Sequence, residues 1–237
     1  MKHLIIVFFL VSLGLGTNAQ SSKKKVVPNL VTFDQKRLHF GFLIGVNTMD
    51  FTIHHSGAST PENGNNPLYA SVESLTPGIN LGIVSSLRLN QNFNLRVLPG
   101  ISFGQRNLSY IDENKVEKED DLQIKSTFIE MPILIKYSSS RIKNYKPYLV
   151  AGINPRYDLA KSKQDGLALN KMDLYYEIGF GIDSYLNYFK LTTEFKISIG
   201  MFDVLNHEGT GDMVDLPYTQ AIDKLTSNIF QLTFYFE

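Results

Sequence analysis

The sequence contains no Cys and no Trp among its 237 residues. Without Cys, an exported chain makes no use of disulfides, which argues against a small disulfide-stapled domain and fits a fold closed by its own hydrogen bonds. The aromatic residues are all Phe or Tyr, 16 and 12 of them. Both types are frequent in β-strands and in the aromatic girdles of membrane barrels.

Long apolar runs and a charge excess of one sign are also missing. After residue 19, no stretch reaches the roughly 20 consecutive apolar residues that a membrane-spanning helix needs. The 23 basic and 23 acidic residues balance, whereas nucleic-acid-binding domains carry a basic patch. No nucleic-acid partner is therefore predicted. No cofactor is predicted either, because Gly179-Phe180-Gly181 lies inside an alternating segment and not between a strand and a helix.

The N-terminus reads MKHLIIVFFLVSLGLGTNAQ, a positive start followed by an apolar run and small residues. This pattern predicts a secretory signal peptide at residues 1–19, cleaved before Gln20. Residues 20–37 then form a polar tail that carries three consecutive basic residues, Lys23, Lys24 and Lys25.

Eight later segments alternate between apolar and polar residues. They lie at residues 38–53, 78–90, 93–106, 123–137, 147–159, 174–183, 189–199 and 228–237. Alternation with period two is typical of strands with one apolar face. In the last segment, NIFQLTFYFE, the apolar face consists of Phe230, Leu232, Phe234 and Phe236. A flat aromatic edge strand is an aggregation hazard, so we expect this strand to close against the first one.

The connections alternate in length. Long polar links at 54–77, 107–122, 160–173 and 200–227 alternate with short ones at 91–92, 138–146 and 186–188. Outer-membrane barrels have long extracellular loops and short periplasmic turns. The prediction is an all-β, eight-stranded antiparallel up-and-down transmembrane β-barrel at residues 38–237, with both termini and the 20–37 tail in the periplasm. A soluble lipocalin-like barrel or sandwich, with the apolar faces turned inward, is the alternative.

The polar faces of these segments carry charges that a membrane barrel would turn inward. They are Arg88, Arg96, Glu130, Lys136, Glu177, Asp183, Glu194 and Lys196. Eight strands leave room for side chains but not for an aqueous channel. Since an unpaired buried charge is costly, we expect acids and bases to pair across neighbouring strands. A sealed, self-neutralising lumen is the main interpretation, and a gated proton or solute path is the alternative.

Possible catalytic residues lie in the long links. His54-His55-Ser56 and His207-Glu208 contain the residue types of a serine hydrolase, but no local signature brings them together. The adjacent histidines lack the spacing of a common metal site, and the acidic stretch 112–121 lacks calcium-loop spacing. We expect solvated loops there, with no catalytic residues and no metal.

Two stretches carry a family resemblance: NLVTFDQKRLHFGFLIGVNTMDF at 29–51 and STFIEMPILIKYSSSRIKNYKPYLVAGI at 126–153. They resemble the PorT family of outer-membrane β-barrels of Bacteroidota, called SprT in gliding bacteria. The resemblance implies a non-enzymatic component of type IX protein secretion and gliding motility. Its expected partners are outer-membrane lipid and other type IX components. Because a small filled barrel cannot pass folded cargo, we expect an accessory or docking role. The alternatives are a surface barrel whose extracellular loops bind ligands or cells, and an outer-leaflet lipid hydrolase.

Overall fold

The computed structural model describes residues 27–55, 68–112, 122–160, 163–164, 167–205 and 222–237. The predicted signal peptide at residues 1–19 and Lys23, Lys24 and Lys25 lie outside these ranges. Within them, no helix is long and apolar enough to cross a membrane.

The described chain consists of one short 3-10 helix, η1 (Phe33–Gln35), and strands. The strands are β1 (Leu38–His55), β2 (Leu68–Arg88), β3 (Phe93–Val97), β4 (Gly100–Asp112), β5 (Leu122–Glu130), β6 (Ile133–Ser138), β7 (Tyr145–Asp158), β8 (Lys163–Gln164), β9 (Leu167–Ala168), β10 (Met172–Tyr185), β11 (Lys190–Gly200) and β12 (Ile222–Phe236). Strands β8 and β9, of two residues each, form a separate antiparallel pair.

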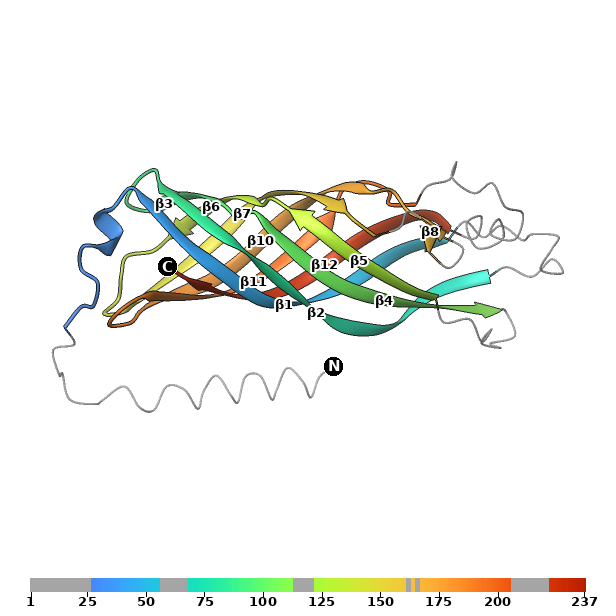
Figure 1. Cartoon of the computed structure of the whole chain (residues 1–237), viewed down its shortest axis with the longest axis horizontal. Coiled ribbons are helices and arrows are strands. Elements are labelled where there is room, and N and C mark those ends of the chain that lie inside the picture. Colours follow the sequence, from blue (N-terminus) through green and yellow to red (C-terminus); the bar gives the residue numbers. More distant parts are fainter. Residues whose placement is uncertain (1–26, 56–67, 113–121, 161–162, 165–166, 206–221) are drawn as a thin grey trace, which may run out of the picture.

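The other ten strands form one closed antiparallel ring (Figure 1). Strands β3 and β4 are one barrel strand interrupted at Leu98-Pro99, and β5 and β6 are another interrupted at Met131-Pro132. Both breaks contain a proline, which has no N–H to continue a ladder. The eight-stranded up-and-down barrel is therefore confirmed, although two of its strands are broken.

The last strand closes the ring against the first, as expected. Phe236 lies opposite Phe42, and Leu232 lies opposite Val46. The rings of Phe42 and Phe236 stack with their centroids 4.8 Å apart. The side chains that define this closure face outward: Phe230, Leu232, Phe234 and Phe236.

The two faces of the wall differ sharply in chemistry. On β10, Ile178 is 61% exposed on the outer face, while the adjacent Glu177 is 2% exposed in the interior. The same alternation puts Phe, Ile, Leu and Tyr outside along the other strands. A soluble barrel would need the opposite arrangement, so the lipocalin-like alternative is wrong.

The two ends of the barrel also differ. The turn end has the short connections 89–92, 139–144 and 186–189 together with residues 27–37 and Glu237. The loop end has the longer connections, most of which lie outside the described residues. At this end several strands are longer than predicted: β2 begins at Leu68, β4 reaches Asp112 and β12 begins at Ile222. These extensions lie outside the segments in which the alternation of the sequence predicted strands.

The in/out register predicts that Ile178→Arg impairs insertion. A charged side chain on the lipid face near the bilayer midplane costs about 2–4 kcal/mol. Folding into lipid vesicles, titrated with urea, measures this loss. Tyr188→Arg, at a residue 91% exposed in a turn, should cost less than about 1 kcal/mol because it lies near the interface. Unimpaired insertion of Ile178→Arg would contradict the register.

Candidate functional site

The interior of the barrel is filled by charged and polar side chains. Seven of the eight charges expected in the lumen are at most 5% exposed: Arg96, Glu130, Lys136, Glu177, Asp183, Glu194 and Lys196. Five further charged side chains are buried with them: Arg106, Arg156, Asp173, Lys190 and Glu237. This gives six bases and six acids, so the described lumen has no net formal charge.

Glu194 on β11 organises the network nearest the turn end. Its carboxylate accepts hydrogen bonds from Tyr148 Oη at 2.7 Å and Tyr235 Oη at 2.5 Å. Arg96 on β3 binds the same carboxylate at 3.0 Å and lies over the Tyr235 ring, 4.2 Å from its centroid. Four strands are thus joined through one carboxylate.

Two more acid–base contacts lie beside this network. Lys136 Nζ on β6 donates to both carboxylate oxygens of Asp183 on β10, each at 2.7 Å. Asp183 also accepts a hydrogen bond from Thr192 Oγ1 at 2.7 Å. Lys190 forms an ion pair with the Glu237 side chain. Lys136 and Lys190 therefore each have a nearby acid, in a space from which water is largely excluded.

Arg156 on β7 organises the network in the middle of the barrel. Its guanidinium lies 2.9 Å from Glu130 and 3.2 Å from Glu177. Glu177 is also bound by Lys196 at 2.8 Å and by Asn154 Nδ2 at 2.7 Å. Two acids and two bases therefore neutralise one another.

The pairs follow two geometries. Arg156 and Lys196 bind acids on neighbouring strands, as expected, but Arg96–Glu194 and Lys136–Asp183 join strands that are not hydrogen-bonded to each other. These contacts bridge the lumen. Gly181 makes room for the Tyr148 side chain, whose hydroxyl binds Glu194, since a Cβ there would lie 2.4 Å from Tyr148 Oη. The lumen is thus cross-braced by side chains in these layers.

Arg88 differs from the expectation. It ends β2 at the turn end, is only partly buried and makes no lumen ion pair with any described residue. Its guanidinium donates instead to the backbone oxygens of Asp34 and Asn90. The alternation of apolar and polar residues predicted correctly which face of the strand carries Arg88, but it does not predict the position of a residue along the barrel axis.

Residues 29–37 form a cap on the turn end. The Phe33 ring stacks on His39, with centroids 4.3 Å apart, and meets the Tyr185 ring edge-on at 6.3 Å. The Asp34 carboxylate accepts the Tyr185 hydroxyl at 2.8 Å and lies 3.7 Å from Lys146 Nζ. The Phe-Asp-Gln part of the sequence is thus a fixed turn, η1, packed on the barrel end (Figure 1).

Asn29 fixes the start of the cap. Its backbone N–H donates to Asn144 Oδ1 at 2.9 Å and its side chain donates to Tyr185 O at 3.1 Å. Arg141 donates to Asn29 O and lies over the Tyr185 ring at 3.8 Å. Anything attached upstream of Asn29, including the 20–28 part of the tail, therefore leaves the barrel from a fixed point.

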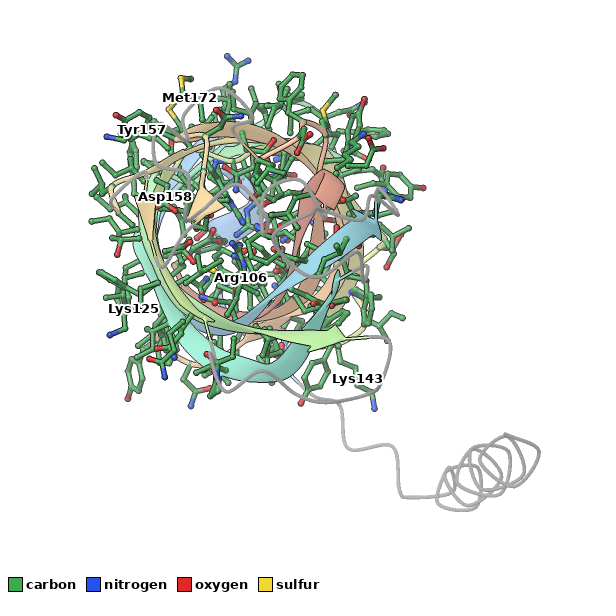
Figure 2. All side chains as sticks on the ribbon, turned by 90° about the vertical axis from the view of Figure 1, so that its right-hand side faces the viewer. Arg106, Lys125, Lys143, Tyr157, Asp158 and Met172 are labelled. Atoms are coloured by element: carbon green, nitrogen blue, oxygen red, sulfur yellow. The ribbon has the colours of Figure 1, made fainter. Side chains whose placement is uncertain are left out.

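The loop end contains a different interior. Arg106 is buried at a polar and aromatic site visible down the barrel axis (Figure 2). It donates to Ser227 Oγ at 2.7 Å and lies 4.1 Å over Phe51, but no carboxylate of the described residues pairs with it. A cavity of about 20 Å³ beside it is lined by Asp158, Asp173 and Tyr175, among others. A cavity of this size has room for about one water molecule.

The residues considered for catalysis are not brought together in the described structure. His54 is exposed at the end of β1. The side chain of His55 and all of Ser56, His207 and Glu208 lie outside the description, as does most of the acidic stretch 112–121. Among the residues described, no three His, Asp or Glu side chains form a group that could hold a metal ion.

Five buried charges were not predicted. Lys190 lies on the polar face of an alternating segment, so the face pattern could have included it. Arg106 ends the third segment and Arg156 lies in the irregular fifth, where Pro155 weakens the pattern. Asp173 and Glu237 lie at the margins of their segments, where alternation gives little guidance.

The outer membrane protein β-barrel domain family matches residues 18–206. The chain belongs to this family. It is accordingly an outer-membrane β-barrel protein, in agreement with the apolar outer wall. No curated protein matches the sequence significantly.

Solved structures with a similar shape include outer-membrane proteins of low sequence identity. OprG from Pseudomonas aeruginosa is 14% identical with a TM-score of 0.46, covering 84% of this chain and 94% of that one. Neisserial surface protein A is 10% identical with a TM-score of 0.43, covering 84% and 98%. Ail of Yersinia pestis, solved with the heparin analogue sucrose octasulfate, is 11% identical with a TM-score of 0.38, covering 85% and 99%.

The Lys136–Asp183 contact predicts a non-additive stability effect. Lys136→Met should cost about 3–5 kcal/mol because it leaves a buried carboxylate without its closest base. Adding Asp183→Leu should recover part of that loss, since no unpaired charge then remains. Urea unfolding of the three variants in lipid vesicles checks this. Equal costs for the single and double variants would mean that water screens the pair.

The contacts of Asp34 predict that the cap opens when they are removed. Asp34→Ala should speed tryptic cleavage after Lys36 and Arg37 about tenfold, since hydrogen bonds to a charged group contribute about 1.5–3 kcal/mol. Gln35→Ala is the matched control, because the Gln35 side chain is exposed. Cleavage rates of the folded protein in detergent provide the measurement. Equal rates for both variants would show that Asp34 does not hold the cap.

Proposed function

We propose that this protein is a non-enzymatic accessory or docking component of type IX protein secretion and gliding motility. The filled lumen carries the argument: paired charges and bridging side chains fill the described interior, and residues 29–37 pack on one end. A barrel of this kind acts through its surfaces and not as the conducting pore. The resemblance of residues 29–51 and 126–153 to the PorT family supplies the pathway.

The basic turn end supports a docking role. Among residues 27–37, 88–92 and 139–146, Asp34 is the single acid, against six bases: Lys36, Arg37, Arg88, Arg141, Lys143 and Lys146. Arg88, Arg141 and Lys146 hold the cap, whereas Lys36, Arg37 and Lys143 are exposed. With this end in the periplasm after signal-peptide cleavage, these side chains extend the basic tail of Lys23, Lys24 and Lys25. A partner with an acidic face would be attracted over about a Debye length.

The partner of this surface is, in this proposal, another type IX component, and the outer wall contacts outer-membrane lipid. The cap gives the tail a defined starting point at Asn29, so a partner that binds the tail would be held close to the barrel. The electrostatic part of this attraction weakens with added salt.

Charge reversal of the exposed bases tests the proposal. A variant with Lys23, Lys24, Lys25, Lys36, Arg37 and Lys143 all replaced by Glu should insert normally, because Lys36, Arg37 and Lys143 are exposed at the turn end and the three lysines precede the first strand. In cells, proteins with type IX sorting domains should then accumulate in the periplasm, as they should on deletion of the gene.

The control is a variant with His54, His55 and His207 replaced by Ala, which should secrete cargo normally. Loss of secretion in this variant at unchanged barrel levels would favour the lipid hydrolase. Normal secretion after gene deletion would reject the type IX role and leave the loop-binding surface barrel. Cysteines introduced at Asn63 or Gly211, but not at Asn92, should label on intact cells if the turn end is periplasmic.

A further inference from the structure

The hydrogen-bonded ladder between β1 and β2 ends before either strand does. It runs from Leu38–Leu87 to Thr48–Pro77. Strand β1 continues to His55, paired with β12, and the earlier part of β2, from Leu68, is paired with β4. Within the described residues, the facing edges of 49–55 and 68–76 have no ladder partner. We name these two edges the seam; in Figure 1, β2 turns away from β1 there.

A bulge in β2 explains why the ladder stops. Thr76 lies opposite Gln105 and Ile79 lies opposite Phe103, so Pro77 and Gly78 together face the single residue Gly104. Pro77 has no N–H, and an extra residue bends the strand that carries it. A second register shift, between Val72 and Ser74, bends β2 again.

The seam lies beyond the lipid-facing band. Val46 and Ile79 are the last outward apolar residues of β1 and β2 before the ladder ends. Above them the outward positions of β1 are Asp50, Thr52 and His54. Unpaired backbone groups are too costly in hydrocarbon but are tolerated where water reaches them. On β1 the ladder with β2 therefore covers the outward apolar residues, and the seam begins where the outward residues of β1 turn polar.

On the β1 side of the seam, the buried inward residues are apolar and lie beside one cation. Met49 and Phe51 of β1 are buried, and the Arg106 guanidinium lies 4.1 Å over the Phe51 ring. Arg106 lies on β4, opposite Leu75 in the β2–β4 ladder, so this contact joins β1 to the strand that pairs with the other edge of the seam. Its Nε has no hydrogen-bond partner and it forms no ion pair among the described residues.

We infer that the seam is a strand-addition site for an extended segment of a partner protein, with an acidic side chain that faces inward to Arg106. An extended polypeptide backbone offers donors and acceptors at the repeat of an unpaired strand edge. The seven residues from Met49 to His55 span roughly 23 Å at about 3.3 Å per residue, enough for a strand of about seven residues. Apolar inward side chains of the partner would meet Met49 and Phe51. This site is separate from the basic turn end, so its failure leaves the proposed function untouched.

The experiment uses the full mature chain in lipid nanodiscs and a labelled peptide, Thr-Val-Thr-Glu-Thr-Val-Thr, whose even positions form one face. Fluorescence anisotropy should detect binding. Replacing the central Glu by Gln should weaken binding at least fivefold, and Arg106→Met should remove that difference. The peptide should also slow amide exchange at 49–55 without changing exchange at 38–48.

Two controls separate strand addition from adhesion. A peptide N-methylated at alternate residues, which keeps its side chains but loses N–H donors, should bind at least tenfold more weakly. A barrel with Pro77→Val and Gly78 deleted restores one residue opposite one and should lose binding, because the ladder can then continue. Should this variant not fold, the N-methylated peptide still decides.

Three results would overturn the inference. Equal binding of the plain and N-methylated peptides would indicate side-chain adhesion. If the peptide does not bind and amides 49–55 are already protected from exchange, then either residues 56–67 of the chain itself or a second copy of the chain occupies the seam. A photocrosslinker at Thr52, with Thr48 as the matched control, distinguishes an intramolecular from an intermolecular occupant. Absent binding with unprotected amides would show an open edge that accepts no strand.

Discussion

The requirement that every backbone polar group in the hydrocarbon layer be paired governs this structure. Pairing of β12 with β1 meets it by removing the last free edge within the apolar band. The alternation of side chains follows from the same closure, since a closed sheet has only an outer lipid face and an inner face. Where the outer face turns polar, the requirement no longer applies, and the β1–β2 ladder ends at Thr48 and Pro77.

Closure of the sheet also encloses charged side chains in a narrow lumen. An interior this narrow cannot hydrate its charges fully, and ten of the twelve buried charged side chains form ion pairs with one another. The networks around Glu194 and Arg156 do so through shared carboxylates, with Tyr and Asn side chains completing the hydrogen bonds. Such a network is costly to disrupt at any single member.

The surfaces of the barrel differ between the two ends. The turn end is basic and is covered by a cap whose position Asn29 and Asp34 fix. The loop end has strands that extend beyond the apolar band, an arginine without a carboxylate partner among the described residues, and two strand edges without ladder partners in the same part of the chain. The turn end suits electrostatic attraction of a partner, whereas the loop end suits directional hydrogen bonding to a partner backbone.

The sequence by itself determined the barrel, the number of its strands, the direction of each face and the closing role of Phe230, Leu232, Phe234 and Phe236. The alternation of apolar and polar residues is a local property of each strand. With lipid outside and a narrow lumen inside, the apolar face of each strand has to point outward. Only the tertiary structure decided which charges meet, because alternation assigns a face but not a height. Arg96 and Glu194, 98 residues apart, meet through the stagger of the strands, while Arg88, on the same face as its predicted partners, lies at the turn end. The cap and the seam likewise depend on register between distant segments, which no local pattern encodes.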